Sequence, residues 1–173
     1  ELYQFGIRNG MILLLNVVTA LVIGLLTEQL AVVAVFTLSF MVLRSYTGGY
    51  HSDSRIFCYL GSNLVLLVPV YTQAVFYKTS LAWLLAVLLV SAGIIFLLSP
   101  MHSKNRKLDK EEQKHFGRKA RLIAALELAV LGILWHAGQI PYAYAVYTGI
   151  CITALFMLVG KAQLWIQSHT ENG

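Results

Sequence analysis

Two residues that stand seven positions apart, His51 and Cys58, are the residues of this sequence best suited to covalent chemistry. We predict that a helix begins between them, with Cys58 in its first or second turn and His51 just outside it. A thiol near a helix N-terminus experiences a positive partial charge that favours the thiolate. An adjacent imidazole can accept the thiol proton and later donate it to a leaving amine. The pair therefore predicts a cysteine nucleophile with a histidine as general base.

The residues around the pair predict the backbone that holds it. Gly48 and Gly49 break the preceding helix and allow a positive φ or a close backbone approach. On one straight helix the Cα atoms of His51 and Cys58 would lie about 10.5 Å apart, too far for a hydrogen bond of about 3 Å. We therefore expect the chain to fold back toward Cys58, or the pair to close when substrate binds. Three polar residues can cap the following helix: Ser52, Asp53 and Ser54.

Spacing alone leaves a structural interpretation open. A single cysteine in an apolar segment is more often a small buried hydrophobe than a nucleophile. A single histidine in a membrane loop is more often an interfacial polar residue than a base. A Gly-Gly pair by itself indicates only a loop.

Composition predicts that these residues lie in a membrane protein. Hydrophobic residues make up 58% of the 173 residues and charged residues only 12%, whereas soluble domains carry about 25% charged residues. The net charge of +5 is typical of cytoplasmic loops, so we predict no nucleic-acid partner. Cys58 and Cys151 fall in different apolar segments, which argues against a disulfide. His102 and His115 lack a third ligand at metal-binding spacing, so we predict no metal and no cofactor.

Hydropathy predicts an all-α, polytopic integral membrane bundle of six transmembrane helices. Lipid admits only helices and closed barrels, and these apolar runs do not alternate with period two. Residues 1–173 form a single integral membrane domain in this interpretation. The chain begins at Glu1 without an initiator methionine, so we expect it to be part of a longer protein. The six apolar stretches are residues 10–27, 30–43, 56–77, 81–98, 120–136 and 142–160.

The distribution of lysine and arginine predicts the orientation of the bundle. If the hydrophilic loop 99–119 is inside, twelve of the thirteen basic residues lie at the inner side, and only Lys78 lies outside. Both termini and the loop that carries His51 are then cytoplasmic. The predicted outer turns, at residues 27–29, 77–80 and 138–141, are short. The basic stretch 104–121, part of which could form a short amphipathic helix, could attract anionic lipid or an acidic peptide segment.

Several polar residues within the apolar stretches need an explanation. Glu127 is either a hydrogen-bonded glutamate packed inside the bundle, or a proton relay, substrate contact or dimer-interface residue. Asn16, Asn63 and Gln73 are better suited to interhelical hydrogen bonds than to ligand binding.

The segment from Arg44 to Cys58 resembles the signature of the accessory gene regulator B family, bacterial membrane cysteine endopeptidases of quorum sensing. The matching pattern has an arginine, a histidine seven residues later, a glycine two before that histidine, and a cysteine seven residues after it. These positions are Arg44, His51, Gly49 and Cys58. Ser99-Pro100 before a basic loop is also similar, and the resemblance runs from about Phe5 to Lys161.

The resemblance implies a reaction and its residues. Such proteins cleave a small precursor peptide (AgrD-like) at the inner membrane face. Cys58 would attack the scissile carbonyl, and His51 would act as base and then as acid. The precursor's own cysteine or serine would then attack the thioester and release a cyclic thiolactone or lactone. Arg44, Gly48 and Gly49 would position the substrate or shape the backbone, and the accessory candidates are Asp53, Asn63 and Glu127.

The resemblance also implies partners and a location. We expect a multi-pass protein of the bacterial cell membrane, in contact with the lipid bilayer and the precursor peptide, and forming a homodimer. Two alternatives compete with the peptidase interpretation: a small six-helix substrate-capture subunit of a membrane transporter, and a structural membrane protein without chemistry. Neither explains the inner cluster of arginine, histidine and cysteine. The short outer turns also argue against a pocket that opens outward.

Overall fold

The computed structural model describes residues 2–48, 55–101 and 109–170, and this part of the chain is helical without a strand. This confirms the all-α prediction. The described helices are α1 (Leu2–Leu26), α2 (Leu30–Thr47), α3 (Arg55–Tyr71), α4 (Gln73–Lys78), α5 (Leu81–Leu98), α6 (Lys110–His136) and α7 (Ile140–Thr170).

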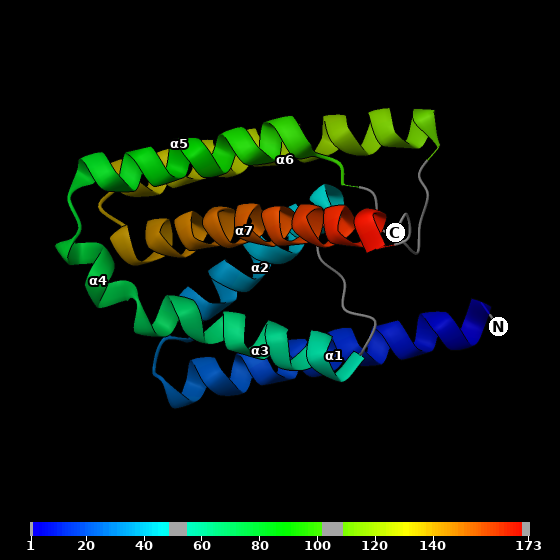
Figure 1. Cartoon of the computed structure of the whole chain (residues 1–173). Helices are drawn as coiled ribbons and strands as arrows, with labels where there is room; N and C mark the ends of the chain where they lie inside the picture. Colours follow the sequence, from blue (N-terminus) through cyan, green and yellow to red (C-terminus); the bar gives the residue numbers. More distant parts are fainter. Residues whose placement is uncertain (1, 49–54, 102–108, 171–173) are drawn as a thin grey trace.

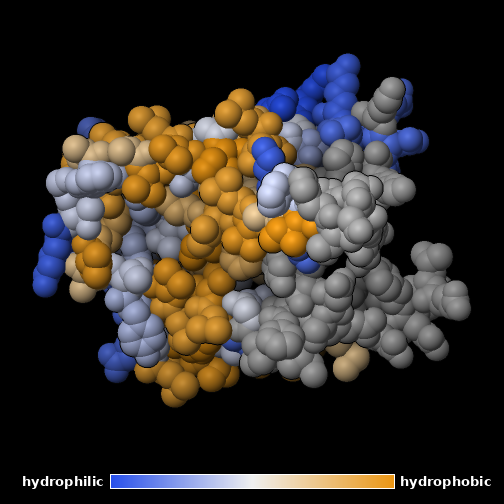
Figure 2. Space-filling model, viewed as in Figure 1, coloured by the Kyte–Doolittle hydropathy of each residue, from blue (hydrophilic) through white to orange (hydrophobic). Residues whose placement is uncertain are grey.

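The long helices run in alternating directions through one bundle (Figure 1). The end at which α2 stops and α3 and α6 start also holds the beginning of α1 and the ends of α5 and α7. We call this the basic end, because it carries Arg44, Lys114, Arg118, Lys119 and Arg121. Figure 2 shows strongly hydrophilic residues gathered over the start of α6 and apolar residues over the middle of the bundle. The alternation explains how basic residues distant in sequence meet at one end.

Three described helices are long and apolar enough to cross a membrane. They are Leu30–Thr47, Leu81–Leu98 and Ile140–Ile166, and shorter apolar helical segments span Leu14–Leu26 and Gly61–Tyr71. Many large apolar side chains of α1 and α5 face outward, including Leu26, Leu89 and Leu97, which are 80%, 72% and 83% exposed. In water such surfaces would be unfavourable, whereas lipid tails solvate them.

The third apolar stretch, expected to be one helix over residues 56–77, is two helices. Pro69 lies inside α3, which ends at Tyr71, and α4 begins at Gln73. Proline removes a backbone donor from the helix and clashes with the preceding turn. At the junction, the Thr72 hydroxyl donates to the Val68 carbonyl at 2.7 Å and also contacts the Tyr144 hydroxyl on α7. The break therefore combines a local cause with a contact to a distant helix.

The hydrophilic loop expected over residues 99–119 is shorter than predicted, because α6 begins at Lys110. The predicted amphipathic segment is not a separate helix but the first turns of α6. The backbone N–H of Asp109 donates to the Glu112 carboxylate at 3.4 Å, which is half of a capping box and supports this early start. The second helix is also longer than the apolar run that predicted it, since α2 continues past Leu43 to Thr47.

Two apolar clusters form the core, and α2 and α7 contribute to both. One cluster centres on Val33 and Phe36 of α2, with Ala145 of α7 and Leu66 of α3. The other includes Leu43 of α2, with Ile150 and Met157 of α7 and residues of α5 and α6. Where α2 crosses α7, a Cβ added at Gly149 would lie 2.6 Å from the Ser39 Oγ. A glycine at this crossing lets the two helices approach closely, as is common between membrane helices.

Candidate functional site

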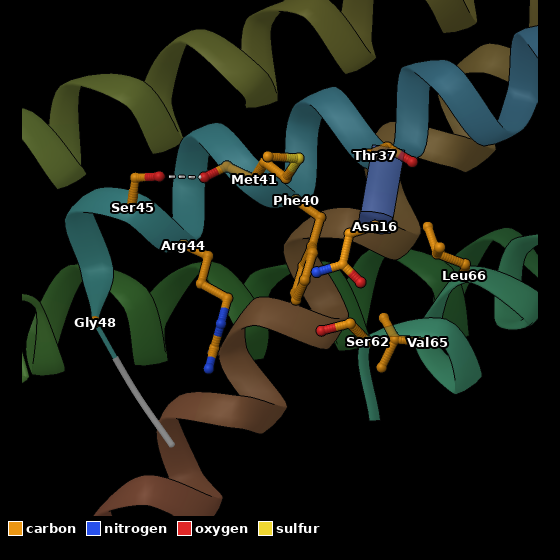
Figure 3. Close-up of a pocket in the computed structure, with 10 residues that line it drawn as sticks. All are labelled: Asn16, Thr37, Phe40, Met41, Arg44, Ser45, Gly48, Ser62, Val65 and Leu66. Carbon is orange, nitrogen blue, oxygen red and sulfur yellow. Dashed lines mark hydrogen bonds between the residues drawn. The ribbon is translucent and has the colours of Figure 1, made fainter. Parts of the chain in front are cut away.

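A cavity of about 340 Å³ lies between α1, α2 and α3, near the basic end (Figure 3). This volume falls within the range of about 300–1,000 Å³ that is typical of ligand pockets. Its walls combine apolar side chains with several polar groups. The lining residues are Asn16 of α1; Thr37, Phe40, Met41, Arg44 and Ser45 of α2; Gly48, which follows α2; and Ser62, Val65 and Leu66 of α3.

Cys58 belongs to the first turn of α3, as the sequence predicted. Its side chain lies outside the described part of the structure, but its position in the helix is defined. Ser62 follows Cys58 by four residues and Val65 follows by seven, and positions at these spacings share one helix face. Ser62 and Val65 both line the cavity. The backbone position of Cys58 therefore continues the cavity-lining face of α3 toward the basic end.

Gly48 ends α2 and requires glycine for two independent reasons. Its backbone has φ 72° and ψ −155°, a region that is essentially restricted to glycine. A Cβ at this position would lie 2.7 Å from the Met101 carbonyl oxygen. The Met101 N–H donates to the Thr47 carbonyl at 2.9 Å, which holds this segment against the end of α2. The prediction that glycine breaks the second helix here is confirmed for Gly48.

Three of the predicted site residues, Gly49, His51 and Asp53, lie outside the described residues. The fold-back of His51 toward Cys58 stays a prediction. The structure nevertheless defines where the segment that carries His51 starts and stops. The described structure stops at Gly48, which lines the cavity, and resumes at Arg55, three residues before Cys58.

Arg44 extends from the last turn of α2 toward α7. Its guanidinium carbon lies 4.6 Å from the ring centroid of Phe156 on α7 and 5.8 Å from that of Phe40 on α2. Cation–π contacts of this kind stabilise a guanidinium in a partly apolar setting. Figure 3 shows the side chain running along one side of the cavity. Arg44 thus joins α2 to α7 while it lines the cavity, and its role toward a substrate stays a prediction.

Two asparagines predicted to form interhelical hydrogen bonds have unpaired oxygens in the described part of the chain. The side-chain oxygens of Asn16 and Asn63 are buried, and no described donor lies within hydrogen-bonding distance of either. Asn16 lines the cavity, whereas Asn63 is not among its lining residues. Sequence reasoning missed Asn16 and Ser62 as cavity residues. The spacing of four between Cys58 and Ser62 was the available signal for the latter.

Glu127 is hydrogen-bonded inside the bundle and does not line the cavity. The Ser39 hydroxyl of α2 donates to Glu127 Oε2 of α6 at 3.0 Å, and Glu127 is not among the ten residues that line the cavity. This agrees with the expectation of a packed, hydrogen-bonded glutamate. The pair joins α2 and α6 at the point where Gly149 of α7 contacts Ser39.

We expect Ser39→Ala to destabilise the protein by about 1 kcal/mol, because it removes the described donor to a partly buried carboxyl group. The thermal unfolding midpoint of detergent-solubilised protein measures this effect. Ser45→Ala is the matched control, since the exposed Ser45 hydroxyl donates to the Met41 carbonyl of its own helix, at 2.7 Å. Equal losses in the two variants would contradict the importance of the Ser39–Glu127 pair.

The start of α6 packs against the end of α2 at the basic end. The rings of Tyr46 and Phe116 lie 6.2 Å apart, and Lys119 Nζ lies 5.8 Å from the Tyr46 ring centroid. Arg121 donates from Nε to the Phe96 carbonyl of α5 at 3.1 Å. Glu111, Lys114 and Arg118 of this segment are exposed. Either anionic lipid or an acidic peptide segment could meet this surface.

Comparison with known proteins identifies the family. The family model of accessory gene regulator B matches residues 1–158. An accessory gene regulator protein B of Staphylococcus intermedius is 26% identical over 156 residues, which cover 88% of this chain and 80% of that protein. Two AgrB-like proteins of Clostridium perfringens, from strain 13 / Type A and strain SM101 / Type A, are each 24% identical over 128 residues, or 70% of this chain.

The match covers 60% of the length of the two clostridial relatives, so the chain spans less than two thirds of them. No solved structure matches this chain. The family match extends over α1 to α6 and most of α7, and includes the cavity, Arg44, Gly48 and the start of α3. The chain belongs to the accessory gene regulator B family.

Proposed function

We propose that this chain is a membrane-embedded cysteine endopeptidase that cleaves an AgrD-like quorum-sensing precursor peptide at the inner membrane face. The observation that carries the proposal is the position of Cys58. It stands in the first turn of α3, on the face that lines the cavity through Ser62 and Val65. A cysteine at a helix start has an environment that favours the thiolate, and the adjacent cavity offers space for a substrate.

The reaction proceeds in two transfers of the acyl group. His51 accepts the thiol proton of Cys58, and the thiolate attacks the scissile carbonyl carbon. The carbon–nitrogen bond breaks as His51 donates that proton to the leaving amine, which leaves a thioester on Cys58. The precursor's own cysteine or serine then attacks the thioester. A thiolactone or lactone ring forms, the attacking group loses its proton, and Cys58 regains one.

The roles that we assign to the other candidate residues follow from their positions. Gly48 turns the chain into the segment that carries Gly49 and His51, and Arg44 lines the cavity beside that turn. Asp53 is better suited to cap α3 than to act as a third catalytic residue. Neither Asn63 nor Glu127 lines the cavity, so we assign both a structural role.

Residues 1–173 act as a single integral membrane domain with six spans and both termini in the cytoplasm. The alternating helices and the basic end support this arrangement, since cytoplasmic loops carry excess lysine and arginine. In this arrangement α3 and α4 together make one span, and the apolar part of α6 makes another. The protein then lies in the bacterial cell membrane as a homodimer.

The proposal is tested by trapping the acyl-enzyme. Wild-type protein co-expressed with a precursor peptide is expected to carry a peptide adduct on Cys58 that hydroxylamine removes, as measured by intact and digest mass spectrometry. His51→Ala should lower the rate of adduct formation by about 100- to 10,000-fold, the usual contribution of a general base. Cleavage without an adduct, or at an unchanged rate in His51→Ala, would contradict the mechanism.

The alternative is a six-helix substrate-capture subunit of a membrane transporter. The cavity between α1, α2 and α3 is the feature that such a protein would share. It predicts reversible binding of an intact ligand and no covalent adduct, so the same experiment separates the two functions.

A further inference from the structure

The side-chain oxygen of Asn16 in the cavity has no hydrogen-bond donor among the described residues. The hydroxyls of Thr37 and Ser45 donate to carbonyls of their own helix, those of Val33 and Met41, each at 2.7 Å. The buried side-chain oxygen of Asn16 has no described donor. Figure 3 shows its carboxamide reaching between Phe40 of α2 and Ser62 of α3. A buried acceptor without a donor destabilises a fold, and a molecule that brings a donor into the cavity would satisfy it.

We propose that this cavity is a substrate subsite that binds the precursor chain within about four residues of the bond that Cys58 attacks. An apolar precursor side chain packs against Phe40, Met41 and Leu66, and the Asn16 side-chain oxygen accepts a hydrogen bond from a precursor backbone N–H. This inference rests on the proposed peptidase function and names the part of the protein that selects its substrate.

Distances along α3 support the assignment. Ser62 stands about 6 Å and Leu66 about 12 Å further along the helix axis than Cys58, at 1.5 Å per residue. An extended peptide advances about 3.3 Å per residue. Roughly two to four residues of substrate therefore reach from the acyl carbon at Cys58 to the walls of the cavity.

The chemistry of the walls fits an extended peptide better than a lipid chain. A peptide that binds in extended form has backbone N–H groups without intramolecular partners, and burial requires that they find acceptors. Asn16 offers such an acceptor in a cavity whose walls also include the apolar side chains of Phe40, Met41 and Leu66. A lipid acyl chain has no donor for Asn16 and would leave its oxygen unsatisfied.

Asn16→Leu tests the proposal in full-length protein with a precursor that the wild type cleaves. It removes the unsatisfied oxygen at similar volume, so the unfolding midpoint should rise or stay unchanged. The kcat/KM for cleavage should nevertheless fall by about threefold to tenfold, mainly through KM. A purely structural role for Asn16 predicts the opposite result, a lower unfolding midpoint with an unchanged kcat/KM. Thr19→Val is the matched control on α1, since the Thr19 hydroxyl donates to the Leu15 carbonyl at 2.8 Å.

Filling the cavity provides a second, independent variant. Val65→Trp places an indole in the cavity and should lower kcat/KM by at least about tenfold, because it displaces an apolar side chain of the substrate. Leu64→Trp is its control, because the neighbouring Leu64 is 67% exposed and does not line the cavity. If Val65→Trp does not fold, Asn16→Leu decides the question.

An unchanged kcat/KM in Asn16→Leu, or an equal fall in Thr19→Val, overturns the subsite, while the peptidase function stands as long as Cys58→Ala is inactive. If Cys58→Ala cleaves the precursor as fast as the wild type, the peptidase function itself is wrong. Full activity of a folded Val65→Trp would point to a lipid or solvent-filled cavity and also overturn the subsite.

Discussion

Cys58→Ala is expected to lower precursor cleavage by at least about 1,000-fold, to a level set by the uncatalysed reaction and residual binding. The variant removes the only group proposed to form a bond to the substrate. Alanine is compatible with the first turn of α3 and has high helix propensity, so folding should not suffer. Cleavage is measured by mass spectrometry of peptide recovered from membranes that contain equal amounts of protein.

The second cysteine of the chain supplies the control. Cys151 lies half-buried on α7, with Ser91 and Tyr147 as neighbours, and it does not line the cavity. Cys151→Ala should therefore keep wild-type cleavage, and thiol-directed inhibition should persist in it and vanish in Cys58→Ala. Inactivation by Cys151→Ala together with full activity of Cys58→Ala would reverse the assignment of the nucleophile.

Gly48→Ala is expected to abolish processing and to destabilise the protein by more than about 2 kcal/mol. The backbone at φ 72° and ψ −155° lies in a region that costs a non-glycine residue about 1–3 kcal/mol. The new Cβ would also lie 2.7 Å from the Met101 carbonyl oxygen, which is backbone and cannot rotate away. Relief of this clash must move either the end of α2 at Gly48, which leads to His51, or the segment at Met101. Cleavage assays and unfolding midpoints measure the two effects.

Gly138 allows the backbone strain at Gly48 to be separated from the steric clash with Met101. It also has a positive φ, 73°, but a Cβ there would meet nothing within 4 Å among its described surroundings. Gly138→Ala should therefore show only conformational strain, about 1 kcal/mol, with cleavage retained. If Gly48→Ala behaves like Gly138→Ala in both assays, the contact with Met101 does not shape the active site.

The sequence by itself determined the structural class of the protein and several positions at which helices begin or end. Composition and apolar run lengths predicted an all-α membrane bundle, since lipid leaves a chain few alternatives. The turn after α1, the end of α2 at Gly48 and the start of α3 before Cys58 were predicted correctly. These features depend on the conformational preferences of a few adjacent residues. The spacing of Arg44, Gly49, His51 and Cys58 indicated the family that the comparison confirmed.

Only the tertiary structure decided which face of each helix packs against which neighbouring helix. It paired Ser39 with Glu127, and it placed the Tyr144 hydroxyl of α7 against Thr72, at the break that Pro69 also favours. It also brought Asn16 of α1 to the same cavity as Arg44 and Ser62. Hydropathy describes each segment separately and says nothing about which face of a helix meets which neighbour. Those pairings arise from close packing between residues far apart in the chain, so the cavity became visible only in the folded bundle.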